Sequence, residues 1–200
     1  MDIGIVPLDF CLGITTPIPK YKGCLKNVST ENFRGITLNP TVSKIFEHCL
    51  LPFFESISTS ERQFGFKKGV GCLNVIHVVR KVVNYFNKSG NTVNLSVIDV
   101  KKAFDNTSVY GVLNLLKSKG VNHSVLKVLS FWFSNTSTKV QWGDRLSEQV
   151  PLTSGVRQGG ILSPFLFAYY VNSVLVNLEK PGLGCFVSNV CYKVLDTPMI

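Results

Sequence analysis

Two carboxylates in the stretch SVIDVKKAFD, Asp99 and Asp105, are candidates for metal chemistry. Asp99 ends a run of apolar, β-branched residues, and a carboxylate at the end of a buried strand is costly unless it is paired or binds a cation. Mg²⁺ in phosphate chemistry typically uses one or two carboxylates together with substrate phosphates. Asp99 is therefore either a Mg²⁺ ligand or the partner of Lys101 or Lys102 in a local ion pair. Asp105 has a simpler alternative role, because an acid near a helix start complements the helix dipole.

A second stretch, SGVRQGGILSP, places three glycines within six residues around an Arg-Gln pair. Glycines allow a backbone to approach another group closely. Arg157 and Gln158 are suited to contact a phosphate or a base edge. The helix expected to begin at Ser163 favours anions at its N-terminus. The alternative is an ordinary tight loop before a helix, and no Gly-Lys-Ser/Thr follows that would make it a P-loop.

The charge balance of the chain indicates what these residues would meet. The 200 residues include 21 Lys and Arg against 12 Asp and Glu, which gives a formal net charge of +9. Hydrophobic residues make up 45% and charged residues 16%, enough apolar material for a core. A folded basic domain attracts polyanions, of which nucleic acid is the commonest. A merely basic soluble protein is the alternative.

The elements that must position these residues follow from hydrophobic periodicity. A first helix is predicted to begin at Thr41, which would be its N-cap, and to end near Pro52. A second helix is predicted from the apolar residues spaced along 76–86, and Gly90 would end it. TVNLSVIDV, residues 92–100, is the strongest strand candidate. Further helices are expected over 109–116, from the cap Asn122, and from Ser163 to about Glu179, with a hairpin at 139–145. The expected apolar face of the first helix is Val42, Ile45, Phe46, Cys49 and Leu50. This order of helices, strand, helices, hairpin and helix predicts an α+β fold.

Targeting and redox features predict an intracellular protein that is not secreted and does not cross a membrane. The N-terminus MDIGIVPLDF lacks a basic region followed by a long apolar run. The most apolar window, 161–178, is interrupted by polar residues, whereas a spanning helix needs about 20 mostly apolar residues. The six cysteines form no Cys-x-x-Cys pair, and free thiols in a reducing compartment are expected.

Four stretches, in order, resemble the reverse transcriptase domain of non-LTR (LINE-type) retrotransposons. PIPKYKGCLKNVSTENFRGITLNPTVSKIFE is similar to the fingers region, and RQFGFKKGVGCLNVIHVV to the family's Gln-Phe-Gly-Phe-Arg block. VIDVKKAFD resembles the first catalytic motif, Asp-x-x-Lys-Ala-Phe-Asp, and SGVRQGGILSP the block Gly-Val-Arg-Gln-Gly-x-x-Leu-Ser-Pro. The likeness covers residues 17–195, although Gly35 stands where the family usually has Pro. It implies a right-hand polymerase, with a fingers-like region and extended N-terminal segment over 1–90 and a partial palm over 91–200.

The resemblance implies a role for each candidate residue. Asp99 would be the catalytic, metal-binding carboxylate for Mg²⁺, with Mn²⁺ as a substitute. Asp105 would give structural support by fixing the turn into the following helix. Phe104 would be the steric gate that selects a deoxyribose. The implied partners are an RNA template, a DNA primer and deoxynucleoside triphosphates. The remaining nucleotide-binding positions would be Lys20 and Arg34 from the fingers, and Arg157, Gln158 and Gly159 from the second stretch.

One family motif is missing from these 200 residues. The family's Tyr-Ala-Asp-Asp would occupy positions 197–200 by spacing, where the sequence has Thr-Pro-Met-Ile. Two-metal transfer needs carboxylates beyond Asp99. We therefore expect a C-terminally truncated reverse transcriptase domain, without the thumb and the catalytic hairpin strand, that does not polymerise by itself. The alternative is a non-catalytic nucleic-acid-binding remnant of a retroelement.

Overall fold

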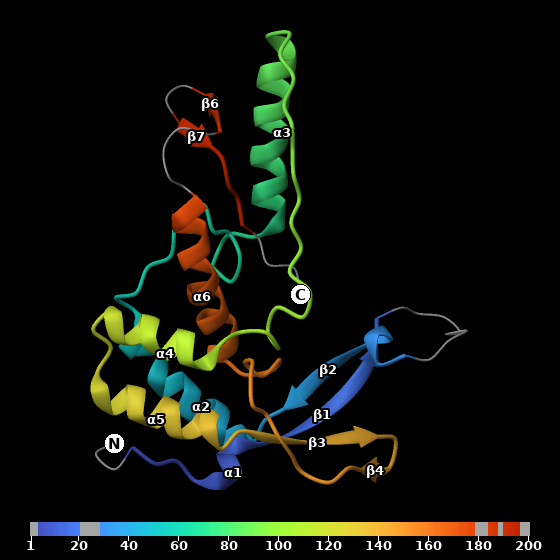
Figure 1. Cartoon of the computed structure of the whole chain (residues 1–200), viewed down its shortest axis with the longest axis vertical. Helices are drawn as coiled ribbons and strands as arrows, with labels where there is room; N and C mark the ends of the chain where they lie inside the picture. Colours follow the sequence, from blue (N-terminus) through green and yellow to red (C-terminus); the bar gives the residue numbers. More distant parts are fainter. Residues whose placement is uncertain (1–3, 21–28, 179–183, 188–189, 197–200) are drawn as a thin grey trace. The chain divides into compact units, whose positions relative to one another are not determined.

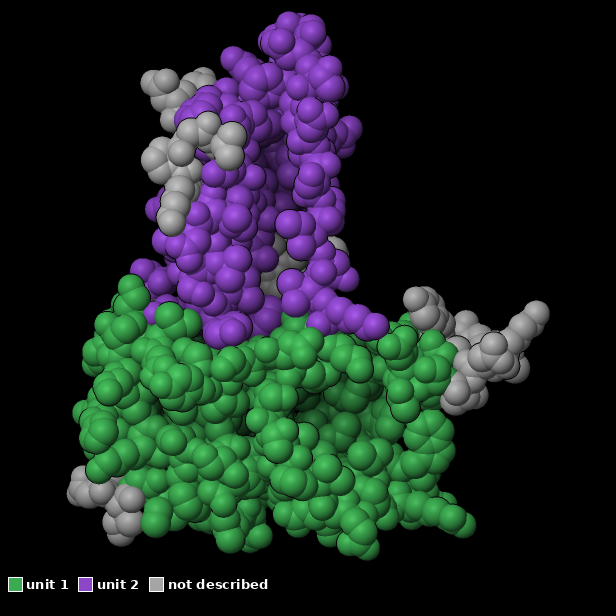
Figure 2. All heavy atoms as spheres, viewed as in Figure 1, with its two compact units in different colours: residues 1–57, 102–166 green, residues 58–101, 167–200 purple. Residues whose placement is uncertain are grey.

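The computed structural model describes residues 4–20, 29–178, 184–187 and 190–196. The chain forms two compact units, each built from two separate stretches of sequence (Figure 2). Unit 1 comprises residues 1–57 and 102–166, and unit 2 comprises residues 58–101 and 167–200.

Unit 1 contains a mixed sheet with the strand order β2-β1-β3-β4, and β5 also pairs with β3 (Figure 1). β1 runs antiparallel to β2 and parallel to β3. Gly143, at φ +59°, makes the turn between β3 and β4, which confirms the predicted hairpin. The strands are β1 (Leu12–Pro19), β2 (Phe33–Leu38), β3 (Ser137–Trp142), β4 (Arg145–Leu146) and β5 (Val150–Pro151).

Helices at one end of this sheet supply the core of unit 1 (Figure 1). The α5 helix begins after Asn122, whose side-chain oxygen accepts a hydrogen bond from the Ser124 N–H at 2.8 Å, as predicted. Its Trp132 is 5% exposed and packs against Phe10 and Phe46, with ring centroids 6.3 and 5.8 Å away. The helices are α1 (Leu8–Cys11), η1 (Thr30–Asn32), α2 (Thr41–Leu50), η2 (Leu51–Phe54), α4 (Val109–Ser118) and α5 (His123–Ser134).

Unit 2 contains α3 (Cys72–Lys88), the hairpin of β6 (Cys185–Val187) and β7 (Val190–Tyr192), and most of α6 (Leu162–Leu178). The loop before α3 is fixed to α6 by polar side chains. The Gln63 amide donates to the Ala168 carbonyl at 2.8 Å, and the Ser60 N–H donates to Asn172 at 2.6 Å. None of the described helices is long and apolar enough to cross a membrane.

The predicted strand over 92–100 is wrong. These residues have no regular secondary structure, and within the described part of the chain no hydrogen bond joins them to another residue. Val97 is 91% exposed and Ile98 is 85% exposed. A strand is stable only when a neighbour pairs with its backbone, and β propensity alone does not supply that neighbour. The expected catalytic hairpin at 197–200 lies outside the described residues. The α+β class itself is confirmed, because unit 1 combines a sheet with helices.

Candidate nucleotide-binding region

Two of the predicted motifs pack directly against each other in unit 1. The Val156 N–H donates to the Phe104 carbonyl at 2.9 Å, and the Gly155 N–H donates to the Thr107 carbonyl at 3.0 Å. Gly155 has φ +83°, and a Cβ there would lie 2.7 Å from the Phe104 carbonyl oxygen. The motif therefore needs glycine at this position both for its backbone conformation and for the close approach.

The same loop continues along the free edge of β2. The Thr37 N–H donates to the Gln158 carbonyl at 2.8 Å, so the loop is hydrogen-bonded to the edge strand of the sheet at one residue. Gly159 follows at φ +119°, and a Cβ there would overlap the Thr37 carbonyl oxygen. The side-chain oxygen of Gln158 is buried and has no hydrogen-bond partner among the described residues. The backbone of this loop is thus held by the sheet, whereas the Gln158 side-chain oxygen is not engaged.

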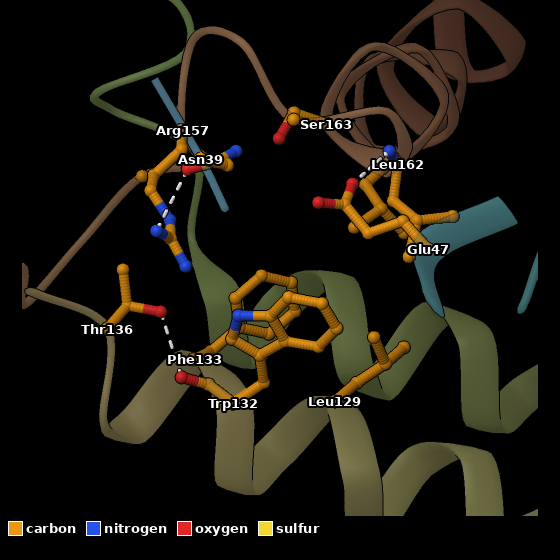
Figure 3. A pocket seen from close by; sticks show the side chains of 12 residues that line it. Asn39, Glu47, Leu129, Trp132, Phe133, Thr136, Arg157, Leu162 and Ser163 are labelled. Atoms are coloured by element: carbon orange, nitrogen blue, oxygen red, sulfur yellow. Dashed lines mark hydrogen bonds between the residues drawn. The ribbon is translucent and has the colours of Figure 1, made fainter. Parts of the chain in front are cut away.

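Arg157 reaches from the loop into unit 1, where its guanidinium binds protein groups (Figure 3). One terminal nitrogen donates to the Asn39 side-chain oxygen at 3.0 Å, and the other donates to the Phe10 carbonyl at 3.2 Å. Burial lowers the pKa of Arg157, and the negative charge of Glu47 offsets part of that shift. Arg157 therefore ties three segments of unit 1 together, while its predicted contact with a nucleotide stays a prediction.

Glu47 is a functional candidate that sequence reasoning missed. Its carboxylate accepts a hydrogen bond from the Leu162 N–H at 2.7 Å and so caps the start of α6 from α2. Burial raises the pKa of Glu47, and hydrogen bonds from the Leu162 and Ile161 amides offset part of that shift. The predicted cap Ser163 instead lies inside the first turn of the helix. The sequence places Glu47 on one helix face with Ser43 and Leu50, four and three residues away, but this spacing does not mark the face as buried.

The buried face of α2 corrects the predicted one. Ser43, Glu47 and Leu50 are buried, whereas Val42 and Ile45 are 60% and 58% exposed. Thr41 is the first helical residue rather than the cap, and Pro40 takes the cap position. Because the Glu47 carboxylate binds the amides at the start of α6, the polar face of α2 is turned inward. The apolar residues of α2 alone do not reveal that interaction.

A small cavity of about 30 Å³ lies between these groups (Figure 3). Its wall combines the polar side chains of Glu47, Arg157 and Asn39 with the rings of Trp132 and Phe133. A cavity needs about 10–15 Å³ of such volume to hold a water, so this one has room for water and is far smaller than a pocket that holds a small-molecule ligand. This region is a support for the loop rather than a substrate pocket.

Lys20 and Arg34 lie on the hairpin formed by β1 and β2. Arg34 pairs with Ile18, and the Lys20 N–H donates to the Asn32 carbonyl at 2.9 Å one step further along. Lys20 lies two residues after Ile18 and therefore on the same face of the strand, and Ile18 is the residue directly opposite Arg34. Lys20 and Arg34 therefore project on the same side of the hairpin. Both are exposed. The structure thus brings together the two cations that the resemblance assigns to the triphosphate.

The remaining candidates differ in burial and in location. Phe104 is 9% exposed, so most of its ring is buried, and Asp105 beside it is exposed. Asp99 is exposed in unit 2, on the segment that forms no strand. Among the described residues no cluster of three His, Cys, Asp or Glu side chains forms a ready metal site. The other predicted site residues, Lys20, Arg34, Phe104, Asp105, Arg157, Gln158 and Gly159, belong to unit 1.

Asp196 is a partly buried acid in unit 2 that pairs with the loop before α3. Its N–H donates to the Arg62 carbonyl at 3.0 Å, and its carbonyl accepts from the Phe64 N–H at 2.8 Å. Burial raises the pKa of Asp196, and the Gln63 side chain offsets part of that shift. One oxygen of each of these two side chains is buried without a hydrogen-bond partner in the described part of the chain. A negative charge on the Asp196 carboxylate therefore weakens the backbone pairing of Asp196 with Arg62 and Phe64.

Replacing Asp196 by asparagine is expected to strengthen the pairing at neutral pH. Because the pKa of Asp196 is raised in the folded state, its contribution to stability is full below the unfolded value, about 4, and is lost as pH rises through the folded value. Hydrogen exchange of the Phe64 amide should show protection that falls with rising pH in the wild type but not in Asp196→Asn. Asp144→Asn, an exposed acid with the same change in net charge, is the control. Equal pH dependence in all three proteins would contradict the prediction.

Comparisons with known proteins identify the family to which this chain belongs. A family model described as reverse transcriptase (RNA-dependent DNA polymerase) matches residues 18–192. A Pol polyprotein from the type-1 retrotransposable element R2 of Popillia japonica is 28% identical over 90% of this chain and 26% of its own length. A probable RNA-directed DNA polymerase from transposon X-element of Drosophila melanogaster is 27% identical over 92% of the chain and 21% of its own length.

A third relative is the Pol polyprotein from the type-2 retrotransposable element R2DM of Drosophila melanogaster, which is 28% identical over 93% of this chain and 17% of its own length. The chain thus spans about a quarter or less of the length of these relatives. The match over residues 18–192 shows that this chain belongs to the reverse transcriptase family, and its similarity to the R2 and X-element proteins confirms the resemblance to non-LTR retrotransposon enzymes.

Proposed function

We propose that the chain is part of the RNA-directed DNA polymerase of a non-LTR retrotransposon and contributes its template- and nucleotide-binding surface. The observation that carries the proposal is the packing of the 154–160 loop on the 104–107 turn, two motifs about 50 residues apart in sequence that meet through backbone hydrogen bonds. The paired cations Lys20 and Arg34 support it, because a triphosphate is a polyanion. The substrates would be deoxynucleoside triphosphates on a DNA primer and an RNA template, in an intracellular compartment.

The proposed division of labour assigns fingers to residues 1–90 and a partial palm to residues 91–200. In this scheme Asp99 holds a Mg²⁺ ion, or Mn²⁺ in its place, Phe104 contacts the sugar, and Asp105 supports the turn. Arg34 and Lys20 bind the triphosphate, and Arg157, Gln158 and Gly159 lie beside the nucleotide and template. A bound divalent ion would stabilise the attacking and leaving oxygens of nucleotidyl transfer.

The metal requirement limits what these residues do alone. Among the described residues Asp99 is a single exposed carboxylate outside any acidic cluster, and the 200-residue sequence contains no Tyr-Ala-Asp-Asp. One carboxylate does not hold two ions against a triphosphate. We therefore propose that this polypeptide binds nucleic acid but does not extend a primer by itself, which is also what a non-catalytic remnant would do.

A primer-extension assay on the purified chain, with Mg²⁺ or Mn²⁺, is expected to show no template-dependent DNA synthesis. Binding of the same primer–template should be measurable by fluorescence anisotropy and should weaken steeply with salt, because lysines and arginines release counterions from the phosphates. Asp99→Ala is the matched control for synthesis and should leave binding unchanged. Template-dependent synthesis that Asp99→Ala abolishes would refute the predicted inactivity, and the absence of salt-dependent binding would refute the nucleic-acid role.

A further inference from the structure

An aromatic pair, the half-buried Phe33 and the exposed Trp142, lies on one face of the unit 1 sheet. The rings of Phe33 in β2 and Trp142 in β3 meet edge to face, with centroids 5.2 Å apart and an angle of 66° between their planes. Such a contact covers at most one face of the indole ring. Trp142 is 58% exposed, so much of its surface is open to solvent. Trp132, in contrast, is 5% exposed and belongs to the core.

The strand register defines what surrounds this pair. Phe33 is paired with Pro19, and Gly35 with Pro17, so all four positions share one face of the sheet with Trp142. Gly35 has no side chain, and the proline rings are compact. The side chains beside the aromatic pair therefore protrude little from the sheet, which leaves room for a planar group to lie against the indole.

The charges on the sheet select the kind of ligand. Strands β1 to β5 contain no acidic residue, and of their three basic residues Arg145 shares the face of Trp142. Arg34 and Lys139 are one residue out of phase and lie on the opposite face. Arg145 is exposed and lies directly opposite Trp142 in the β3–β4 ladder, so its guanidinium is within reach of a ligand on the ring. Asp144 in the turn is the neighbouring acid. An aromatic face beside an arginine, on a chain of net charge +9, fits a ligand that combines flat rings with phosphates.

We infer that Trp142 and Phe33, with Arg145, form a stacking platform for an unpaired base of single-stranded nucleic acid. The inference rests on the proposed function and adds a binding position to it, on the hairpin of β3 and β4. Bases in a duplex are already stacked on each other, whereas a single strand presents free base faces. The platform therefore favours single-stranded over double-stranded nucleic acid and does not depend on base identity.

Binding of a fluorescein-labelled single-stranded RNA of about 12 nucleotides, within the range of known single-strand site sizes, tests the platform. Trp142→Leu is expected to weaken binding about tenfold, the size typical of losing one base–aromatic stack, whereas Trp142→Phe should retain most of the affinity. Leu146→Ala is the matched control. Leu146 is 57% exposed on the same hairpin but pairs with Gln141 and so lies on the other face. It should bind as the wild type does.

Two further readouts separate stacking from charge and from folding. An RNA of the same length with abasic sites should bind more weakly to the wild type, and this difference should vanish in Trp142→Leu. Arg145→Gln should lower the salt slope of binding by about one unit, while Trp142→Leu leaves the slope unchanged. The fluorescence of the core residue Trp132 monitors whether each variant retains its fold.

The outcomes distinguish this inference from the function on which it rests. Salt-dependent binding that is the same in wild type, Trp142→Leu and Trp142→Phe would leave the nucleic-acid role intact and overturn the platform. This would also be the result if the aromatic face binds another protein. An equal loss in Trp142→Leu and Leu146→Ala would likewise overturn it. A wild-type chain that binds no nucleic acid would overturn both.

Discussion

Replacing Gly159 by alanine is expected to lower the free energy of unfolding of unit 1 by about 3 kcal/mol or more. Gly159 has φ +119°, a region of backbone space that is almost restricted to glycine and costs other residues about 1–3 kcal/mol. The added Cβ would also overlap the Thr37 carbonyl oxygen, which belongs to the sheet backbone and cannot rotate away. The substitution must therefore break the contact between the loop and β2. Folded domains are stable by only about 5–15 kcal/mol, so this is a large effect.

Urea unfolding followed by tryptophan fluorescence measures this change, because Trp132 and Trp142 both lie in unit 1. Gly143→Ala is the matched control. Gly143 also has a positive φ, +59°, but a Cβ there would meet no atom within 4 Å. Its cost should be the conformational term alone, about 1–2 kcal/mol. Equal losses for the two variants would show that the approach to Thr37 is not what the loop requires.

Replacing Glu47 by alanine is expected to cost about 3 kcal/mol in unit 1. The carboxylate accepts hydrogen bonds from the first amides of α6, and a buried N–H left without an acceptor costs about 1–3 kcal/mol. The substitution also removes the negative charge that supports the half-buried guanidinium of Arg157. Both effects act on the ends of the 157–160 segment, so the loop should loosen along with the helix start.

Glu47→Gln separates the cap from the charge. A glutamine side chain has nearly the same shape and still offers an oxygen to the Leu162 N–H, so it should cost less than Glu47→Ala, by about 1 kcal/mol or more. The free energy of unfolding and the exchange rate of the Leu162 amide are the two measurements. A Glu47→Gln variant as unstable as Glu47→Ala would show that the charge, and not the helix cap, is the main contribution.

Local sequence signals determined the helices and the turn well. The predicted helices after Thr41, along 76–86 and after Asn122 are present. The Asn122 cap is confirmed, because a cap acts within a few residues. The predicted buried faces were less accurate, since Val42, Ile45 and Ile76 are more than half exposed. Gly143 and its neighbours determine the β3–β4 turn for the same reason. The family is also visible in the sequence, since four motifs in a fixed order are preserved in the residue types themselves.

Tertiary structure decided the features that depend on partners far away in the chain. TVNLSVIDV has the composition of a strand, but pairing requires a neighbouring backbone, and the described residues supply none. The buried face of α2 depends on amides at the start of α6, which makes Glu47 a core residue despite its charge.

The glycines of the 154–160 loop show how the two kinds of information combine. Their number in the sequence predicts a close approach without naming the partner. The structure identifies the Phe104–Asp105 backbone for Gly155 and the Thr37 carbonyl for Gly159. The sequence by itself thus determined the family, the helices and the candidate residues, because these are written in residue types and short spacings. Tertiary structure alone decided which backbone each loop residue meets, because that choice depends on contacts across about 50 residues for Gly155 and about 120 for Gly159.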